Sequence, residues 1–453
     1  MNIDQSQLLE PQREHAMKLL NSLYMNGVAA DLSETGTGKT YTSCWIAKQM
    51  NRPVLVICPK IMISNWERTM KLFGIKAQII NYELLIRGTT KIVSVNTLEN
   101  ATYENQFRIN LNPSTLVILD ECHKCKALTS KNSLLMAALK FNKYKMLLLS
   151  ASAATNPLEM RSFGYVTGLH NYKGFGSWVK DMGAYTNRHG HYQIDIESNG
   201  VLKQMATIHN ELFNKLGVSS RMVRKAFGNI FPKNVVTSDP FHMGSNTDKI
   251  NDVYLNMDAE LAKLDERASN YSNHQFAIIM EARRRVELYK VPTMVEHMIN
   301  RYENKLSPVC FVNFTETVHA IKERLDRSKG LMKQIGYIVG GQTPKQRERD
   351  IDAFQADEKR LMLVNIKAGN AGVSLHDLNG NHPRESIISP TYSAIDMIQS
   401  MGRIHRAEAK TPTVQNVMFA SQTIEENVCR KVADKLNSLS VFNDNELNPH
   451  AIM

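Results

Sequence analysis

The sequence lacks several features that would assign it to a specialised class of protein. Its 453 residues contain no apolar run approaching the roughly 18 residues that a membrane-spanning helix needs. The first residues have neither the basic nor the apolar region of a signal peptide, so we expect a cytoplasmic protein, in a bacterium or in a host cell. There is no low-complexity segment, and 43% hydrophobic with 22% charged residues is the composition of an ordinary folded protein.

Cysteine is scarce as well. The six cysteines are scattered along the chain, as is typical of a reducing compartment. Cys122 and Cys125 have the spacing of half a zinc site, but a structural zinc ion needs four ligands and the sequence has no second cysteine pair. We therefore expect neither a structural zinc ion nor a redox function.

Positive charge, in contrast, is in surplus. Lysine and arginine number 55 against 44 acidic residues, which gives a net charge of +11. A protein that neutralises phosphates needs such a surplus, although many basic proteins bind no nucleic acid. The chain is also too long for one hydrophobic core, which indicates two or three domains.

Apolar runs alternate with helical patterns in two regions, which predicts an α/β fold with doubly wound parallel sheets. Between the two regions, residues 160–230 are polar and helical, and residues 246–305 form a long charged helical stretch. A helix from Thr423 to about Leu439 ends the pattern. In the first region, four runs are predicted as buried parallel strands: Val54–Ile57, Lys91–Val95, Leu116–Leu119 and Met146–Leu149. In the second region, five runs are predicted as strands: Val309–Val312, Gln334–Val339, Leu361–Val364, Ser386–Ile388 and Val414–Phe419.

A glycine-rich segment between a short apolar run and a helical pattern has the composition of a phosphate-binding loop. It reads Ser-Glu-Thr-Gly-Thr-Gly-Lys-Thr over residues 33–40, with Ser33 in place of the first glycine of the general pattern. Glycines let backbone N–H groups surround phosphate oxygens, and the following helix N-terminus adds partial positive charge. Lys39 can then reach the β- and γ-phosphates, and the Thr40 hydroxyl can hold magnesium. The alternative is a chance glycine turn, which the flanking strand and helix disfavour.

Two adjacent acids follow the apolar run Leu116–Leu119. At the end of a buried strand, Asp120 lies where it can hold magnesium, and Glu121 lies where it can orient and deprotonate the attacking water. Two acids in this position can also simply cap a turn. The phosphate loop upstream favours the catalytic interpretation.

Arg403 and Arg406 stand three residues apart, and we expect them to share one face of a helix. Such a pair can act as arginine fingers that stabilise charge on the γ-phosphate in the transition state. Taken alone, the pair is better explained as a solvated basic face.

In this order along the chain, the motifs resemble the core of helicase superfamily 2 and, within it, the SWI/SNF-like translocases. The resemblance extends from Leu9 to about Lys435. It implies two tandem RecA-like (P-loop) parallel-sheet domains with a helical insertion, and ATP and Mg²⁺ as cofactors. The implied domains are a RecA-like ATP-binding domain (1–160), a helical insertion and linker (161–230), a helical lead-in (231–305) and a second RecA-like domain with a C-terminal helix (306–453).

The resemblance also assigns residues to the nucleotide site. Gln12 occupies the position of the adenine-reading glutamine, in a motif one residue shorter than is usual, and Gln399–Arg406 match the motif that supplies arginine fingers. The implied catalytic residues are Lys39, Asp120, Glu121, Arg403 and Arg406, with Thr40 and Asp120 on the metal. The implied nucleotide-binding residues are Gln12, Thr35, Gly36, Thr37, Gly38, Lys39, Thr40, His123 and Gln399.

A second set of motifs implies contacts with the nucleic-acid strand. These motifs place glycines where backbone amides approach phosphates, and polar side chains at the ends of strands. Ser150 and Ser152 would couple the nucleotide site to the nucleic acid. The implied contact residues are Lys60, Asn65, Asn96, Thr97, Ser152, Asn313, Lys367, Gly369 and Gly372.

The resemblance implies an ATP-dependent translocase or helicase that acts on duplex or branched DNA with little sequence specificity. Because the chain has almost nothing outside the motor, we expect a compact phage-like, viral or bacterial enzyme that acts as a monomer. An RNA helicase is an alternative, since similar acidic motifs around Asp120 occur there. The resemblance of Leu149–Glu159, Lys367–Leu375 and the closing Thr423–Glu426 element to motifs of the SWI/SNF-like translocases argues against it. A scaffold that binds nucleic acid and does not hydrolyse ATP is the other alternative.

Overall fold

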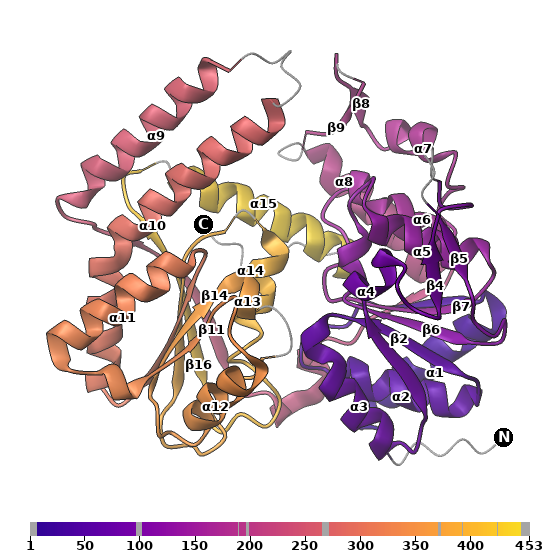
Figure 1. Cartoon of the computed structure of the whole chain (residues 1–453), viewed down its shortest axis with the longest axis horizontal. Helices are drawn as coiled ribbons and strands as arrows, with labels where there is room; N and C mark the ends of the chain where they lie inside the picture. The colour runs from indigo at the N-terminus through magenta and orange to yellow at the C-terminus, as the bar shows by residue number, and fades with distance from the viewer. Residues whose placement is uncertain are drawn as a thin grey trace. The chain divides into compact units, whose positions relative to one another are not determined.

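The computed structural model describes residues 7–96, 102–188, 190–195, 199–264, 271–369, 373–391, 393–423 and 425–444. These residues form two units (Figure 1). The first contains the described residues up to Gly228 together with residues 434–444, and the second runs from Asn229 to Ala433. A six-stranded parallel sheet lies at the centre of each unit. The predicted α/β fold with two tandem RecA-like domains is therefore confirmed.

The sheet of the first unit has the strand order β10-β1-β7-β6-β2-β3, and all its neighbouring strands are parallel. Its middle strands are buried along their length, which explains their nearly continuous apolar sequences. The strands are β1 (Val28–Asp31), β2 (Val54–Cys58), β3 (Ala77–Asn81), β6 (Leu116–Asp120), β7 (Lys145–Leu149) and β10 (Ser219–Ser220).

Contrary to the prediction, Lys91–Val95 does not form a buried parallel strand of this sheet. Only β4 (Val93–Val95) is extended there, and it pairs antiparallel with β5 (Phe107–Ile109) in a separate two-stranded sheet. Its side chains alternate, with Val93 buried and Ser94 exposed, as in a strand with one solvated face. The place beside β2 belongs to β3, whose two polar residues hid it from a search for apolar runs.

Helices cover both faces of the first sheet (Figure 1). One face packs against α1 (Glu10–Met25), α2 (Lys39–Met50) and α3 (Ile63–Leu72), with Trp45 and Trp66 fully buried in the core between them. On the other face lie α4 (Tyr82–Arg87), α5 (Lys131–Phe141) and α6 (Arg161–Thr167).

The predicted insertion after residue 160 is mainly helical and then returns to the sheet. It contains α7 (Phe175–Asp181), a hairpin of β8 (Tyr185–Thr186) with β9 (Tyr192–Gln193), and α8 (Asn199–His209). The short strand β10 follows and pairs with β1 at the edge of the first sheet. The end of the insertion therefore lies next to the strand that leads into the phosphate loop.

The sheet of the second unit has the order β11-β16-β15-β12-β14-β13 and is also entirely parallel. All five predicted strands of this region are confirmed, and β11 is added at the edge. The strands are β11 (Asn234–Phe241), β12 (Ser307–Val312), β13 (Ile335–Ile338), β14 (Leu361–Asn365), β15 (Arg384–Ile388) and β16 (Thr413–Ala420).

The charged stretch before β12 forms two helices that pack along each other (Figure 1). In the part of the chain that the structure describes, no helix is both long enough and apolar enough to cross a bilayer. The helices of this unit are α9 (Asn246–Ala262), α10 (Tyr271–Glu303), α11 (Thr315–Lys329), α12 (Pro344–Gln355), α13 (Ile366–Gly369), α14 (Ala394–Met401) and the first part of α15 (Glu425–Asp444).

A buried carboxylate of α10 joins this helix to the end of β12. Glu287 is 2% exposed and accepts four hydrogen bonds. Two come from the backbone and side-chain nitrogens of Asn313, both at 2.8 Å, and two from Phe314 N at 3.1 Å and Thr317 Oγ1 at 2.8 Å. The carboxylate therefore fixes the loop between β12 and α11.

We expect Glu287→Ala to destabilise the second unit by about 3 kcal/mol, because the four donors around this buried carboxylate lose a charged acceptor. For a unit of this size that loss lowers the melting temperature by roughly 6–12 °C, which calorimetry of the full chain measures. The control is Glu316→Ala, which removes a carboxylate that is 61% exposed and should change little. Equal melting temperatures for the two variants would contradict this role of Glu287.

Candidate functional site

The loops that follow the strands of the first sheet meet at one edge, where the strands have their carboxyl ends. Asp31 at the end of β1 and Asp120 at the end of β6 both pair with Leu149 of β7, the strand between them. Two strand spacings separate the aspartates, or about 9.5 Å. The phosphate loop leaves this edge after Asp31, and Glu121 leaves it after Asp120. The structure therefore brings the two predicted halves of the nucleotide site together.

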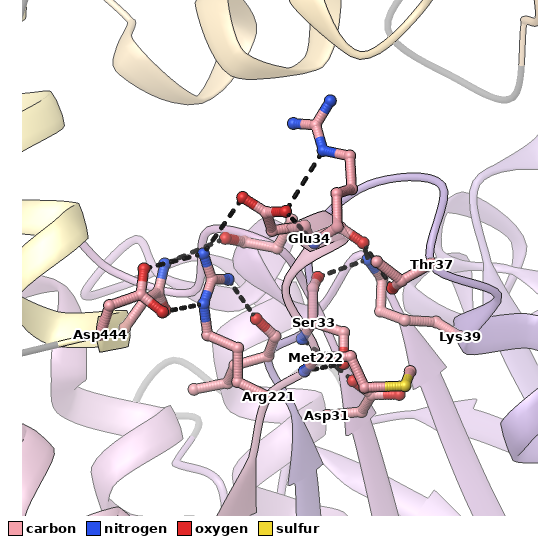
Figure 2. A network of polar contacts seen from close by, with 12 residues as sticks. Asp31, Ser33, Glu34, Thr37, Lys39, Arg221, Met222 and Asp444 are labelled. Carbon is pink, nitrogen blue, oxygen red and sulfur yellow. Dashed lines mark hydrogen bonds and ion pairs between the residues drawn. The ribbon is translucent and has the colours of Figure 1, made fainter. Parts of the chain in front are cut away.

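The phosphate loop is held in a tight turn by two glycines and by its own lysine. Gly36 and Gly38 have φ of 86° and 90°, a conformation that side chains disfavour. Lys39 begins α2, and its Nζ donates to the carbonyl oxygens of Ser33 at 2.7 Å and Glu34 at 3.0 Å (Figure 2). Burial lowers the pKa of Lys39, although the carboxylates of the site oppose this shift.

The threonines of the loop differ in their surroundings. Thr37 is buried and its hydroxyl donates to the Glu34 carbonyl over 2.8 Å. The Thr35 hydroxyl is also buried, and no hydrogen-bond partner accompanies it. Thr40 lies half-buried in the first turn of α2, where its hydroxyl can face a bound metal. Thr35 and Thr40 remain predicted nucleotide and metal contacts.

Gln12 lies directly against the phosphate loop. Its side-chain Nε2 donates to the Thr37 carbonyl over 2.9 Å, while its Oε1 accepts from the backbone of Leu9 over 3.0 Å. A Cβ atom added to Gly38 would lie 2.3 Å from Gln12 Nε2. Gln12, the predicted adenine-reading residue, therefore supports the glycine turn of the loop.

Asp31 is a buried carboxylate that the sequence motifs did not include. Its Oδ1 lies 3.1 Å from His15 Nε2 and accepts from Ser33 N over 3.0 Å. Burial opposes its ionisation, but His15, Lys39 and Ser33 together hold the pKa of Asp31 below its usual value. His15 also contacts Ser220 of the neighbouring strand β10 over 2.8 Å. A negative charge is therefore fixed beneath the phosphate loop.

The pKa of Asp120 is shifted in the opposite direction from that of Asp31. Burial and the neighbouring Glu121 raise the pKa of Asp120 to about 7, against a hydrogen bond of 2.8 Å from Trp66 Nε1. A divalent cation would favour the ionised form, and carboxylate and hydroxyl oxygens such as those of Asp120 and Thr40 suit magnesium. The described residues contain no group of three or more His, Cys, Asp or Glu side chains that could hold a metal.

Glu121 begins a chain of polar contacts that leads to the loop after β7. Its backbone has φ 54° and ψ 49°, a left-handed conformation that is strained for a residue with a side chain. Its Oε2 lies 3.2 Å from His123 Nδ1, which is 3.3 Å from Ser150 Oγ. Ser150 Oγ in turn accepts from Ser152 N over 3.1 Å. The two serines that we predict to couple the sites are therefore connected to Glu121 through His123.

In the second unit, Arg403 and Arg406 do not share a helix face as predicted. Helix α14 ends at Met401, and both arginines lie in the turns that follow, where residue spacing no longer sets direction. They nevertheless converge, because Arg403 Nη1 and Arg406 Nη2 each donate to the Val373 carbonyl over 3.3 Å. Gln399 is buried on α14 itself.

The predicted nucleic-acid contacts of the first unit differ in exposure. Lys60 after β2 and Asn96 after β4 are exposed, and Asn65 on α3 is partly buried. Ser152 is only 1% exposed, so its position suits coupling better than a direct contact. Thr97 lies outside the described residues.

In the second unit, two strand ends bring predicted contact residues close to each other. Asn313 follows β12, and its carbonyl accepts from Asn365 at the end of the neighbouring strand β14 over 2.9 Å. Lys367 is exposed two residues later on α13. Gly369 is buried, and a Cβ atom there would lie 2.4 Å from Val364. Gly372 lies outside the described residues.

Sequence reasoning missed His15, Trp66 and Asp31 as parts of the site. The position of Asp31 at the end of the strand before the loop is a local signal that could have identified it. His15 and Trp66 lie on helices whose local sequence gives no sign that they reach the sheet edge.

Two family models match the chain, one in each unit. Residues 6–154 match the family model described as Type III restriction enzyme, res subunit, and residues 289–408 match that of the Helicase conserved C-terminal domain. A protein of Acanthamoeba polyphaga mimivirus whose name describes it as an ATP-dependent RNA helicase is 27% identical over 472 residues, covering 99% of this chain and 86% of the relative. The SWI2/SNF2 ATPase core of Sulfolobus solfataricus in complex with dsDNA has a TM-score of 0.36 and 15% identity, with 98% of this chain and 92% of that chain covered.

We expect Gly38→Ala to lower the affinity for ATP by at least roughly tenfold, because the new methyl group adds strain at positive φ and collides with Gln12. A fluorescent N-methylanthraniloyl ATP (mant-ATP) titration measures the affinity. Gly27→Ala is the control, since Gly27 also has positive φ but no atom within 4 Å of an added Cβ. Unchanged mant-ATP binding by Gly38→Ala would contradict the proposed packing of the loop.

Proposed function

Because the chain belongs to the superfamily 2 helicases, whose family models match residues 6–154 and 289–408, we propose that it is an ATP-dependent DNA translocase or helicase. Membership of this family makes the chain an ATP-hydrolysing enzyme. The proposed substrates are duplex or branched DNA, as in branch migration, fork remodelling, recombination or repair.

The observation that carries the proposal is the common edge of the first sheet, where a phosphate loop faces an acid pair. Lys39 is the residue proposed to bind the β- and γ-phosphates, in exchange for the carbonyl oxygens that it contacts in this structure. Magnesium bound with ATP would neutralise phosphate charge, with Thr40 and Asp120 as its proposed ligands. Gln12 supports the loop and is proposed to contact the adenine.

Glu121 is proposed to orient the attacking water and to accept its proton. Its backbone has a strained left-handed conformation, and such strain is typical of functional positions. His123 and Ser150 connect Glu121 with the loop after β7, so a change at the γ-phosphate can reach Ser152. This chain of contacts supports a coupling of hydrolysis to movement on a strand.

Arg403 and Arg406 are proposed to stabilise negative charge on the γ-phosphate during hydrolysis. The proposal rests on their match to the family motif and on their shared contact with the Val373 carbonyl, which directs two guanidinium groups to one place.

The choice of DNA rests on the resemblance of Lys367–Leu375 and Thr423–Glu426 to the motifs of SWI/SNF-like translocases. An RNA helicase is the second candidate, because the mimivirus relative carries that name. In either case phosphate contacts dominate binding, so affinity should fall steeply with salt and depend little on sequence.

We expect Lys39→Ala and Glu121→Gln to reduce ATP turnover by at least roughly a hundredfold, for different reasons. Lys39→Ala weakens binding of mant-ATP, whereas Glu121→Gln retains it because only proton transfer is lost. DNA affinity, followed by fluorescence anisotropy, should change little in both. Lys215→Ala, which removes an exposed ammonium, is the control. Normal turnover by Lys39→Ala would show that the phosphate site is assigned wrongly.

The proposed substrate is tested by ATP hydrolysis without nucleic acid, with single-stranded DNA, with linear duplex, with a four-way junction and with RNA. We expect duplex or junction DNA to stimulate hydrolysis strongly and RNA to stimulate it little. Stimulation by RNA alone would contradict the DNA proposal in favour of an RNA helicase. Junction stimulation would make branch migration the next activity to measure.

A further inference from the structure

Arg221 contacts the phosphate loop, although the sequence motifs gave it no part in the nucleotide site. It directly follows β10, and Ser220 of that strand pairs with Asp31 of β1. The side chain is only 10% exposed. Its Nη1 donates to the Leu32 carbonyl over 2.6 Å, and its Nη2 lies 3.8 Å from the Glu34 carboxylate (Figure 2). Arg221 therefore contacts the segment that joins β1 to the glycine turn.

The other side of the Arg221 guanidinium is held by Asp444 at the end of α15 (Figure 2). Nε donates to Oδ1 over 2.6 Å and Nη2 donates to Oδ2 over 3.0 Å. Two parallel hydrogen bonds of this kind fix the plane of the guanidinium as well as its position. Because Asp444 is 28% exposed, this anchor lies at the margin of the site and not in its core.

Glu34 connects this anchor with the catalytic lysine. Its carboxylate accepts from Arg224 N over 2.6 Å and Arg224 Nε over 3.2 Å. Its carbonyl oxygen accepts from Lys39 Nζ over 3.0 Å and from Thr37 Oγ1 over 2.8 Å. Burial opposes ionisation, but Arg224 and Arg221 hold the pKa of Glu34 below its usual value. One residue thus bonds the arginines through its side chain and Lys39 through its backbone.

We propose that Arg221, anchored by Asp444, is a positioning residue for ATP that fixes the backbone of Leu32–Glu34 against which Lys39 is held. When phosphates enter, Lys39 exchanges the carbonyl oxygens of this segment for phosphate oxygens. The arginine contacts keep the segment in place during that exchange, so the loop stays shaped for phosphates. The inference rests on the nucleotide site proposed above and is independent of the choice between DNA and RNA.

Asp444→Asn tests this role because it keeps the size of the side chain and removes its charge. We expect KM for ATP and Kd for mant-ATP to rise about fivefold to tenfold, with kcat at saturating ATP within about twofold, since ground-state and transition-state binding are weakened alike. Arg221→Lys should have a similar effect, because an ammonium cannot bind Leu32 and both oxygens of Asp444 in this geometry. The double variant should be no worse than Arg221→Lys alone, because Asp444 acts through the guanidinium that this variant already lacks.

The matched control is Arg301→Gln, which removes a 2.7 Å bond from Arg301 Nε to the buried Glu385 in the second unit. It should leave KM and Kd for ATP unchanged, whatever it does to stability. A lower melting temperature of Asp444→Asn with unchanged KM and Kd would overturn the proposal, as would additive effects in the double variant. If the wild-type chain hydrolyses no ATP with any nucleic acid, that result counts against the proposed function. The change in Kd for mant-ATP between the wild type and the Asp444 and Arg221 variants would still test the role of Arg221.

Discussion

Charges buried at the carboxyl ends of β1 and β6 impose the constraint on which the rest of the first unit depends. Asp31 is fully buried and Asp120 nearly so. A carboxylate taken out of water costs several kcal/mol unless donors and opposite charges surround it. Those groups come from elements that also build the core: His15 on α1 contacts Asp31, and the fully buried Trp66 on α3 donates to Asp120. Core packing and the nucleotide site therefore cannot be changed independently, because one set of helices serves both.

The two units each contain a buried carboxylate, and the two carboxylates differ in how well neighbouring groups stabilise their charge. Glu287 in the second unit receives four hydrogen bonds from neighbouring groups, so its charge is satisfied by the protein itself. Asp120 has a raised pKa because burial and Glu121 outweigh the hydrogen bond from Trp66. The magnesium ion proposed above would favour the ionised form of Asp120, and acids with perturbed pKa values often gather at binding sites.

The sequence allowed most strands to be predicted because buried parallel strands are apolar on both faces, a pattern visible within five residues. The phosphate loop and the acid pair were predictable for the same reason: their chemistry is local. Contacts between distant segments were not predictable. His15 meets Ser220 across 205 residues, and Arg221 meets Asp444 across 223. Arg403 and Arg406 were placed on a helix face because their spacing allows it, yet whether a helix continues through them depends on contacts that spacing does not contain.

The lysine of the phosphate loop explains how such a site can do mechanical work. In this structure Lys39 is bonded to two carbonyl oxygens, and burial lowers its pKa. Phosphates therefore do not fill an empty position but replace existing partners, and only the difference between the two sets of contacts contributes to binding. A site with two alternative sets of partners has two discrete states, and a ligand shifts their populations by its differential affinity. Ser33 and Glu34 would keep their bonds to Lys39 in one state and lose them in the other, so the position of the lysine would follow the nucleotide while the loop backbone stays in place. The polar chain from Glu121 to Ser152 begins at the same sheet edge, so hydrolysis and movement can share one local switch.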